Sequence, residues 1–138
     1  MEDAQVFAAL HTIRTNPAYR AAEILRLRTE GGAAAMAKAA KTSDEYGAVL
    51  LLVNTWEAIA SILEHVSEST REAVFAVTPV AQMHEALRPA IDALGTGCPE
   101  FGERFTAMAR QHREWLSGCG KGGDYVSGNC GGLQALFG

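Results

Sequence analysis

The spacing of apolar residues predicts helices along almost the whole chain. Over residues 3–14, apolar side chains recur at intervals of three and four: Val6, Phe7, Leu10 and Ile13. That interval is the period of one face of an α-helix. A second helix is expected from Pro17, with Asn16 as its N-cap, and it should end near the Gly31-Gly32 pair because paired glycines are costly in a helix. The small-residue stretch AAAMAKAAK then predicts a further short helix.

Residues 42–66 have the broadest apolar surface and should form the central helix. Thr42 and Glu45 match a T-x-x-E capping box at its start. Its apolar face comprises Val49, Leu52, Val53, Trp56, Ile59, Ala60, Leu63 and Val66. The remaining polar stripe, which includes Glu57, Ser61 and Glu64, is expected to face solvent. The most apolar stretch, residues 46–63, has Asn54 and Glu57 near its middle, and these polar residues argue against a membrane span.

Three further helices complete the predicted fold. A second capping box at residues 69–72 precedes a short helix, and the Thr-Pro pair at 78–79 should begin a helix that continues to about residue 94. Pro89 lies inside that helix and is expected to kink it. The last helix should begin at Pro99 and end at Gly118, with the pairs Glu100–Arg104 and Arg110–Glu114 on its exposed side.

No segment alternates apolar and polar residues as a half-buried strand does. The sequence therefore predicts an all-α protein, a compact single-domain bundle of five to seven helices formed by residues 1–118. A length of 138 residues suits one core. Residues 119–138 should form a Gly-rich C-terminal tail.

Part of the chain resembles a known bacterial family. The matching stretches, within about residues 50–115, are NTWEAIASILEHVSESTREAVF, HEALRPAID and FGERFTAMA. They carry an aromatic–Glu pair at Trp56-Glu57, an L-x-P-x-I element at residues 87–91, and the aromatic pair Phe101 and Phe105. In these features the chain is similar to the family catalogued as domain of unknown function 4760. The resemblance implies an all-helical fold in a bacterial protein and no particular reaction.

The tail, CGKGGDYVSGNCGGLQALFG, carries the candidate partner-docking residues: Tyr125, Val126, Leu133, Leu136 and Phe137. The last three are spaced for one helical turn, which is too short to be stable alone. The tail is therefore expected to dock on its own domain, on a second copy of the chain, or on another protein. A homo-oligomer that exchanges tails between copies is a further interpretation.

Recognisable catalytic and cofactor motifs are absent from the sequence. The glycines of the tail do not match a phosphate-binding loop, and the three cysteines include no C-x-x-C pair. No E-x-x-H pattern for a helical metal site occurs either. We therefore expect no catalytic residues, no metal and no cofactor. A net charge of −4 disfavours direct binding of nucleic acid. No secretory signal is recognised, so a cytoplasmic location with reduced thiols is expected.

An alternative ligand face lies on the last predicted helix, at Arg104, Arg110, His112 and Arg113. A basic groove for an anion would form if this helix met the arginines of the second one, Arg20, Arg26 and Arg28. His112 is expected to be a hydrogen-bonded histidine in the core or at its boundary, because it lies on the apolar face of its helix.

Two functions follow from these patterns. The first is a non-catalytic protein–protein interaction module that acts as an adaptor or an inhibitor and belongs, in one interpretation, to a phage or mobile element. The second is a helical domain that binds a small ligand or anion with arginine and histidine side chains between helices. Neither function requires a membrane.

Overall fold

A computed structural model describes residues 3–121 of the chain, and within that range it is all-α. The elements are, in order, α1 (Asp3–Arg14), α2 (Pro17–Arg28), α3 (Gly32–Lys38), α4 (Asp44–Glu64), α5 (Glu68–Phe75), α6 (Val80–Leu94), the short 3-10 turn η1 (Gly95–Gly97) and α7 (Glu103–Lys121). The described part contains seven α-helices and no strand, so the predicted fold class is confirmed.

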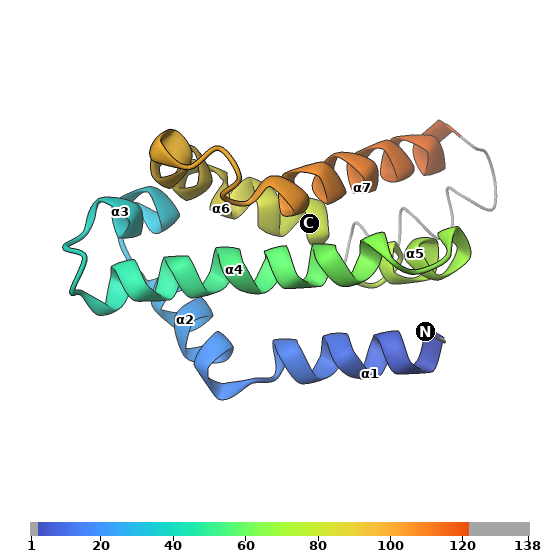
Figure 1. Cartoon of the computed structure of the whole chain (residues 1–138), viewed down its shortest axis with the longest axis horizontal. Coiled ribbons are helices and arrows are strands. Elements are labelled where there is room, and N and C mark those ends of the chain that lie inside the picture. Colours follow the sequence, from blue (N-terminus) through green and yellow to red (C-terminus); the bar gives the residue numbers. More distant parts are fainter. Residues whose placement is uncertain (1–2, 122–138) are drawn as a thin grey trace.

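Helix α4 runs through the middle of the bundle (Figure 1). Helices α1 and α2 pack on one side of it, and α6 and α7 pack on the other, with α3 and α5 at opposite ends. Eight residues of α4 are buried in contact with these neighbours: Ala48, Val49, Leu52, Val53, Trp56, Ile59, Ala60 and Leu63. The prediction of a central helix is confirmed, and α4 owes its broad apolar surface to helices on both sides.

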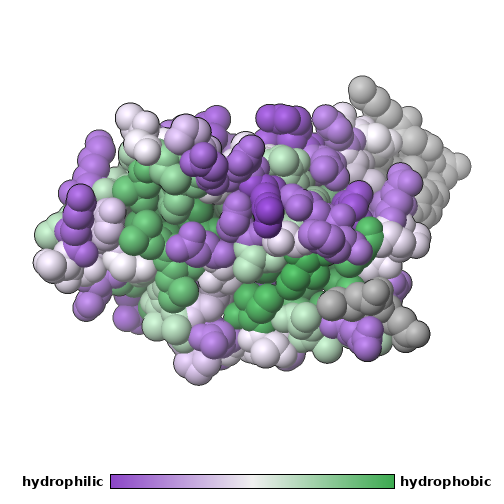
Figure 2. Space-filling model, viewed as in Figure 1, coloured by the Kyte–Doolittle hydropathy of each residue, from purple (hydrophilic) through white to green (hydrophobic). Residues whose placement is uncertain are grey.

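The surface in the same view is mostly hydrophilic (Figure 2). Apolar residues gather in two areas of this face, one at its left end and one along the seam between α1 and α4. Among the described helices, α4 alone has the length and apolar composition that a membrane crossing requires. Its central place in the bundle supplies a second explanation for that composition.

Polar side chains cap the starts of α2, α4 and α5, but not always those predicted. Asn16 is the N-cap of α2, as expected, and its Oδ1 accepts the backbone N–H of Ala18 at 2.8 Å. Helix α4 is capped by Ser43 instead of Thr42, and α5 by Ser67 instead of Ser69. The two capping-box predictions were therefore misplaced by one and two residues. Ser43 and Ser67 each lie directly before the first helical turn, where the side chain can accept a backbone N–H that has no partner within the helix.

Further boundaries also differ from the predictions. Pro79 is itself the N-cap of α6 and the helix begins at Val80, while Pro89 lies inside α6 as predicted. Helix α7 begins at Glu103 instead of Pro99, and it continues through Gly118 to Lys121. Neither predicted ion pair on α7 is present, and the guanidinium of Arg104 instead pairs with Glu64, at 3.9 Å.

Gly102 explains why α7 starts where it does. Its φ of +71° favours glycine, and a Cβ on this residue would lie 3.2 Å from the side chain of Ile91. Its carbonyl accepts the N–H of Thr106 at 2.9 Å, which places Gly102 at the N-cap position of α7. A glycine has no side chain to complete that cap, so a group from elsewhere in the fold must do so.

Candidate functional site

Glu57 of α4 supplies the missing cap of α7. Its Oε2 accepts the backbone N–H of Arg104 at 3.1 Å, and its Oε1 accepts that of Phe105 at 2.8 Å. These two donors lie in the first turn of α7, where a carboxylate is also favoured by the helix dipole. The expectation that Glu57 belongs to a solvent-facing stripe was wrong, because this carboxylate joins two helices.

Replacing Glu57 with alanine should lower the free energy of unfolding by about 1–2 kcal/mol, because two backbone N–H groups lose a charged acceptor. Glu64→Ala is the matched control, since Glu64 contacts the same Arg104 but only through an exposed ion pair at 3.9 Å. That control should cost less than about 0.5 kcal/mol. Urea unfolding followed by circular dichroism measures both variants, and equal losses would contradict the capping role.

His112 is the buried member of the predicted ligand face. It is 1% exposed, and both ring nitrogens are in hydrogen bonds. Nδ1 accepts the backbone N–H of Ala81 at 3.0 Å, so Nε2 carries the proton and donates to the Phe75 carbonyl at 3.1 Å. Burial lowers the pKa of His112 to about 4. The interpretation of His112 as a hydrogen-bonded core histidine is confirmed, and the ring offers no free nitrogen to a ligand.

The three arginines of the predicted ligand face do not converge on one site. Arg104 is hydrogen-bonded to Ser61 of α4 at 3.1 Å, whereas Arg113 lies 3.5 Å from Nδ1 of His84 on α6. These two arginines are nine residues apart, which places them on opposite sides of a helix. Arg110 enters a third region, the cleft beside α6. The basic groove between α2 and α7 does not form either, because α4 lies between those helices.

His84 is a second buried histidine between α6 and α7. It is 4% exposed, and its Nε2 lies 3.1 Å from the hydroxyl of Thr106. Burial lowers the pKa of His84, and the positive charge of Arg113 acts in the same direction. A neutral imidazole beside an arginine and a threonine holds α6 against α7, and Thr106 also lines a cleft between α6, η1 and the beginning of α7.

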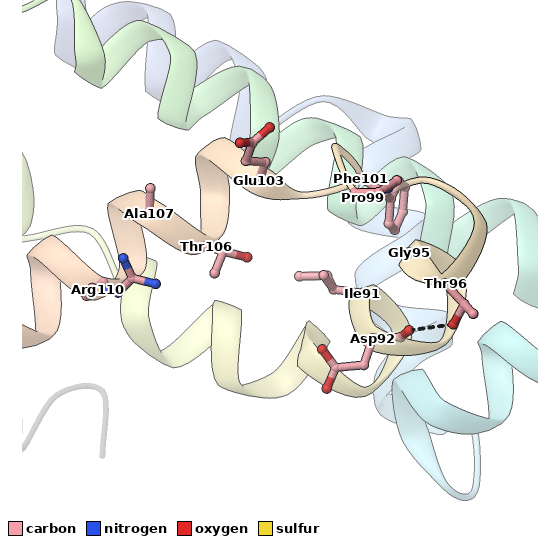
Figure 3. A pocket seen from close by; sticks show the side chains of 10 residues that line it. All are labelled: Ile91, Asp92, Gly95, Thr96, Pro99, Phe101, Glu103, Thr106, Ala107 and Arg110. Atoms are coloured by element: carbon pink, nitrogen blue, oxygen red, sulfur yellow. Dashed lines mark hydrogen bonds between the residues drawn. The ribbon is translucent and has the colours of Figure 1, made fainter.

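A cleft with a volume of about 520 Å³ lies between α6, η1 and the beginning of α7. Figure 3 shows Asp92 entering it from α6 and Arg110 from α7, with the Thr96 hydroxyl bonded to the backbone carbonyl of Asp92. The acidic and basic groups lie apart, and no ion pair joins them. This cleft therefore lacks the concentration of positive charge that an anion site needs.

A third cluster joins α1, α2 and α4 at Arg14, Tyr19 and Trp56. Trp56 is fully buried, and its Nε1–H donates to the Tyr19 hydroxyl at 3.1 Å. The guanidinium carbon of Arg14 lies 5.7 Å from the centroid of the Trp56 ring, a cation–π distance. Sequence reasoning assigned no role to Arg14, because nothing in its local sequence signals a contact with a tryptophan 42 positions away.

Metal ligands do not gather in the described part of the chain, where no three His, Cys, Asp or Glu side chains form a possible ion site. Cys98 is exposed, and its thiol lies 3.4 Å from a carboxylate oxygen of Glu100. The tail residues Tyr125, Val126, Leu133, Leu136 and Phe137 lie outside the described residues, so their docking role stays a prediction.

No protein-family model, curated protein or solved structure matches this chain. The resemblance to domain of unknown function 4760 therefore stays a prediction. The residues that carry it do meet in the structure: the rings of Trp56 and Phe105 stack at 5.6 Å, and Glu57 caps the helix that contains Phe105. These residues pack helices together, so any functional conclusion has to come from the surface.

Proposed function

We propose that this protein is a non-catalytic interaction module that binds an acidic amphipathic segment of a partner protein on the exposed face of α2. The carrying observation is that Leu27 is 70% exposed and Ile24 is 44% exposed, although both are large apolar residues. Exposed Arg20 and Arg28 complete this face, since the four residues follow i, i+4, i+7, i+8 spacing along one side of a helix. We call these four residues the α2 face.

The charge distribution favours an acidic partner. Residues 14–41 contain six Arg or Lys and two Glu, a balance of +4, whereas the whole chain has a net charge of −4. Within α2, Glu23 is held by Arg26 at 2.5 Å, so Arg20 and Arg28 remain as the charges that flank Ile24 and Leu27. Complementary charge around an apolar strip steers a partner and fixes its register.

A binding role also accounts for the chemistry on the described surface better than a reaction does. The buried histidines are hydrogen-bonded within the fold, and the cleft beside α6 has separated charges. A contiguous exposed apolar patch marks a contact surface, and Ile24 and Leu27 lie three residues apart on the same side of α2. Adaptor and inhibitor both fit this proposal, since each needs only a surface that recognises another protein.

Leu27→Glu should weaken partner binding by roughly tenfold or more, because it places a negative charge at the centre of the α2 face, where the partner would bury it. The full chain is used as bait in lysate of its source organism, and captured proteins are identified and cross-linked to map the contacting segment. Arg20→Glu and Arg28→Glu should weaken capture as well, more strongly at low salt. Val77→Glu is the matched control, because Val77 is apolar and 51% exposed but lies outside α2.

The supporting result is a protein whose acidic amphipathic segment cross-links to α2 and whose capture is lost in Leu27→Glu but kept in Val77→Glu. Equal capture by all variants would overturn the proposal. Capture that disappears after nuclease treatment would assign the α2 face to nucleic acid, and loss of a dimer in Leu27→Glu would assign it to self-association. Either of these results also overturns it.

A further inference from the structure

An open cavity of about 360 Å³ lies between α1, the beginning of α2 and the segment that joins α5 to α6. Its walls include the apolar side chains of Phe7, Leu10 and Val77. Polar residues complete the lining, so the walls are partly apolar and partly polar: His11, Arg14, Thr15, Tyr19 and Thr78. This volume is in the range of small-molecule sites, and a few polar groups on apolar walls are typical of them.

Arg14 is a charged group without an anionic partner in the described part of the chain. Its Nε is buried and has no hydrogen-bond partner, and no carboxylate of residues 3–118 lies within ion-pair distance of its guanidinium. The ring of Trp56 satisfies part of the charge through its face. A partly desolvated cation of this kind is stabilised by an anion, and an arginine fork matches a carboxylate in particular.

Tyr19 adds a hydrogen-bond donor to the same cavity. Its hydroxyl oxygen already accepts the Trp56 Nε1–H at 3.1 Å, and no described residue accepts its own proton. Burial, followed by the nearby Glu23 carboxylate, raises the pKa of Tyr19. The hydroxyl therefore keeps its proton at neutral pH and can donate it to a ligand oxygen.

From this arrangement we infer that the cavity binds a small monocarboxylate with an apolar body. The carboxylate would lie against the Arg14 guanidinium and the Tyr19 hydroxyl, and the apolar body against Phe7, Leu10 and Val77. Arg14 is the one arginine among the residues that line this cavity, so it matches one negative charge and disfavours a polyanion. This site lies outside the α2 face and does not depend on the function proposed for that face.

Benzoate is a suitable probe, with benzamide as its neutral counterpart and inorganic phosphate as an anion without an apolar body. Isothermal titration and Trp fluorescence, which reports on the Trp56 ring beside Arg14, measure binding to the full chain. Benzoate should bind saturably and raise the melting temperature, since it binds the folded state. Arg14→Gln should weaken benzoate binding about tenfold, because the charged hydrogen bonds are lost.

Val77→Glu is a second variant that tests the same cavity if Arg14→Gln fails to fold. Val77 is 51% exposed at the cavity wall, so a carboxylate there leaves the core intact and should compete with benzoate for Arg14. Leu27→Glu, which alters the α2 face, should bind benzoate as the wild type does. Equal binding of benzamide and benzoate would overturn the inference, as would no binding of benzoate, or benzoate binding that Val77→Glu leaves unchanged.

Discussion

Replacing Trp56 with alanine should lower the free energy of unfolding by about 3–5 kcal/mol, the largest single effect expected in the molecule. Trp56 is 0% exposed, and its ring stacks on Phe105 of α7 at a centroid distance of 5.6 Å. Its Nε1–H bonds to Tyr19 of α2. The substitution therefore leaves a cavity in the core beside α4 and removes contacts to helices on both sides of α4.

Urea unfolding followed by far-UV circular dichroism measures this loss. Trp56→Phe is the informative companion, because it keeps an aromatic ring against Phe105 but removes the donor to Tyr19, and it should cost about 1–2 kcal/mol. Trp115→Ala removes the same side chain from a partly buried position near the end of the bundle, so its loss should be smaller. Equal losses in Trp56→Ala and Trp115→Ala would contradict the central role of Trp56.

Apolar periodicity predicted the helices well because each amphipathic face has to be buried against the core. The broad face of α4 indicated neighbours on most sides, and the structure places helices on both sides of it. Asn16 with Pro17 was also readable, since an Asn-Pro pair before an apolar repeat supplies both the side-chain cap and the required backbone angle. These signals are local, and the fold does not have to override them.

Helix boundaries were less predictable where several residues competed for one cap. Before α4, Thr42 and Ser43 are adjacent hydroxyl residues, and the choice of Ser43 depends on where the first helical turn forms. Before α7, Gly102 has no side chain, and the cap comes from Glu57, which lies 45 positions earlier in the sequence. A spacing rule within one helix cannot reveal a cap that another helix provides.

The arginines of the predicted ligand face on α7 do not form one site, for a geometric reason that their spacing in the sequence already indicates. Arg104 and Arg113 are nine residues apart, so a helix directs them to opposite sides. The cavity beside Arg14 was not readable in the same way. It combines the end of α1, the beginning of α2 and the segment after α5, and only tertiary packing brings Tyr19 and Val77 to the same space.

Acidification should destabilise the fold through His112. Burial lowers the pKa of this histidine to about 4, against an ordinary value of 6.5. Between these two values the unfolded chain binds a proton that the folded chain does not, so stability decreases as the pH falls through this range. The total loss expected is about 3 kcal/mol, complete only below about pH 4. Above about pH 6.5 both states are neutral at this residue, and it adds no pH dependence.

The hydrogen bonds of His112 give the structural cause. Nδ1 accepts the N–H of Ala81, so a second ring proton would face another donor inside the core. His112→Gln tests this, because an amide oxygen can accept from Ala81 and an amide nitrogen can donate to the Phe75 carbonyl without titrating. Its stability should therefore fall less steeply than that of the wild type between about pH 6.5 and pH 4.5.

Unfolding in urea at several pH values, from about pH 7.5 to about pH 4.5, measures the two slopes. Ile59→Val is the control, because it removes a buried methylene from α4 and should lower stability by about 1 kcal/mol at every pH. Subtracting the variants cancels the titration of the carboxylates that they share. The pKa of His84 is also lowered by burial, so a smaller slope should remain in His112→Gln. If the two proteins had the same slope, His112 would not be the residue that couples folding to pH.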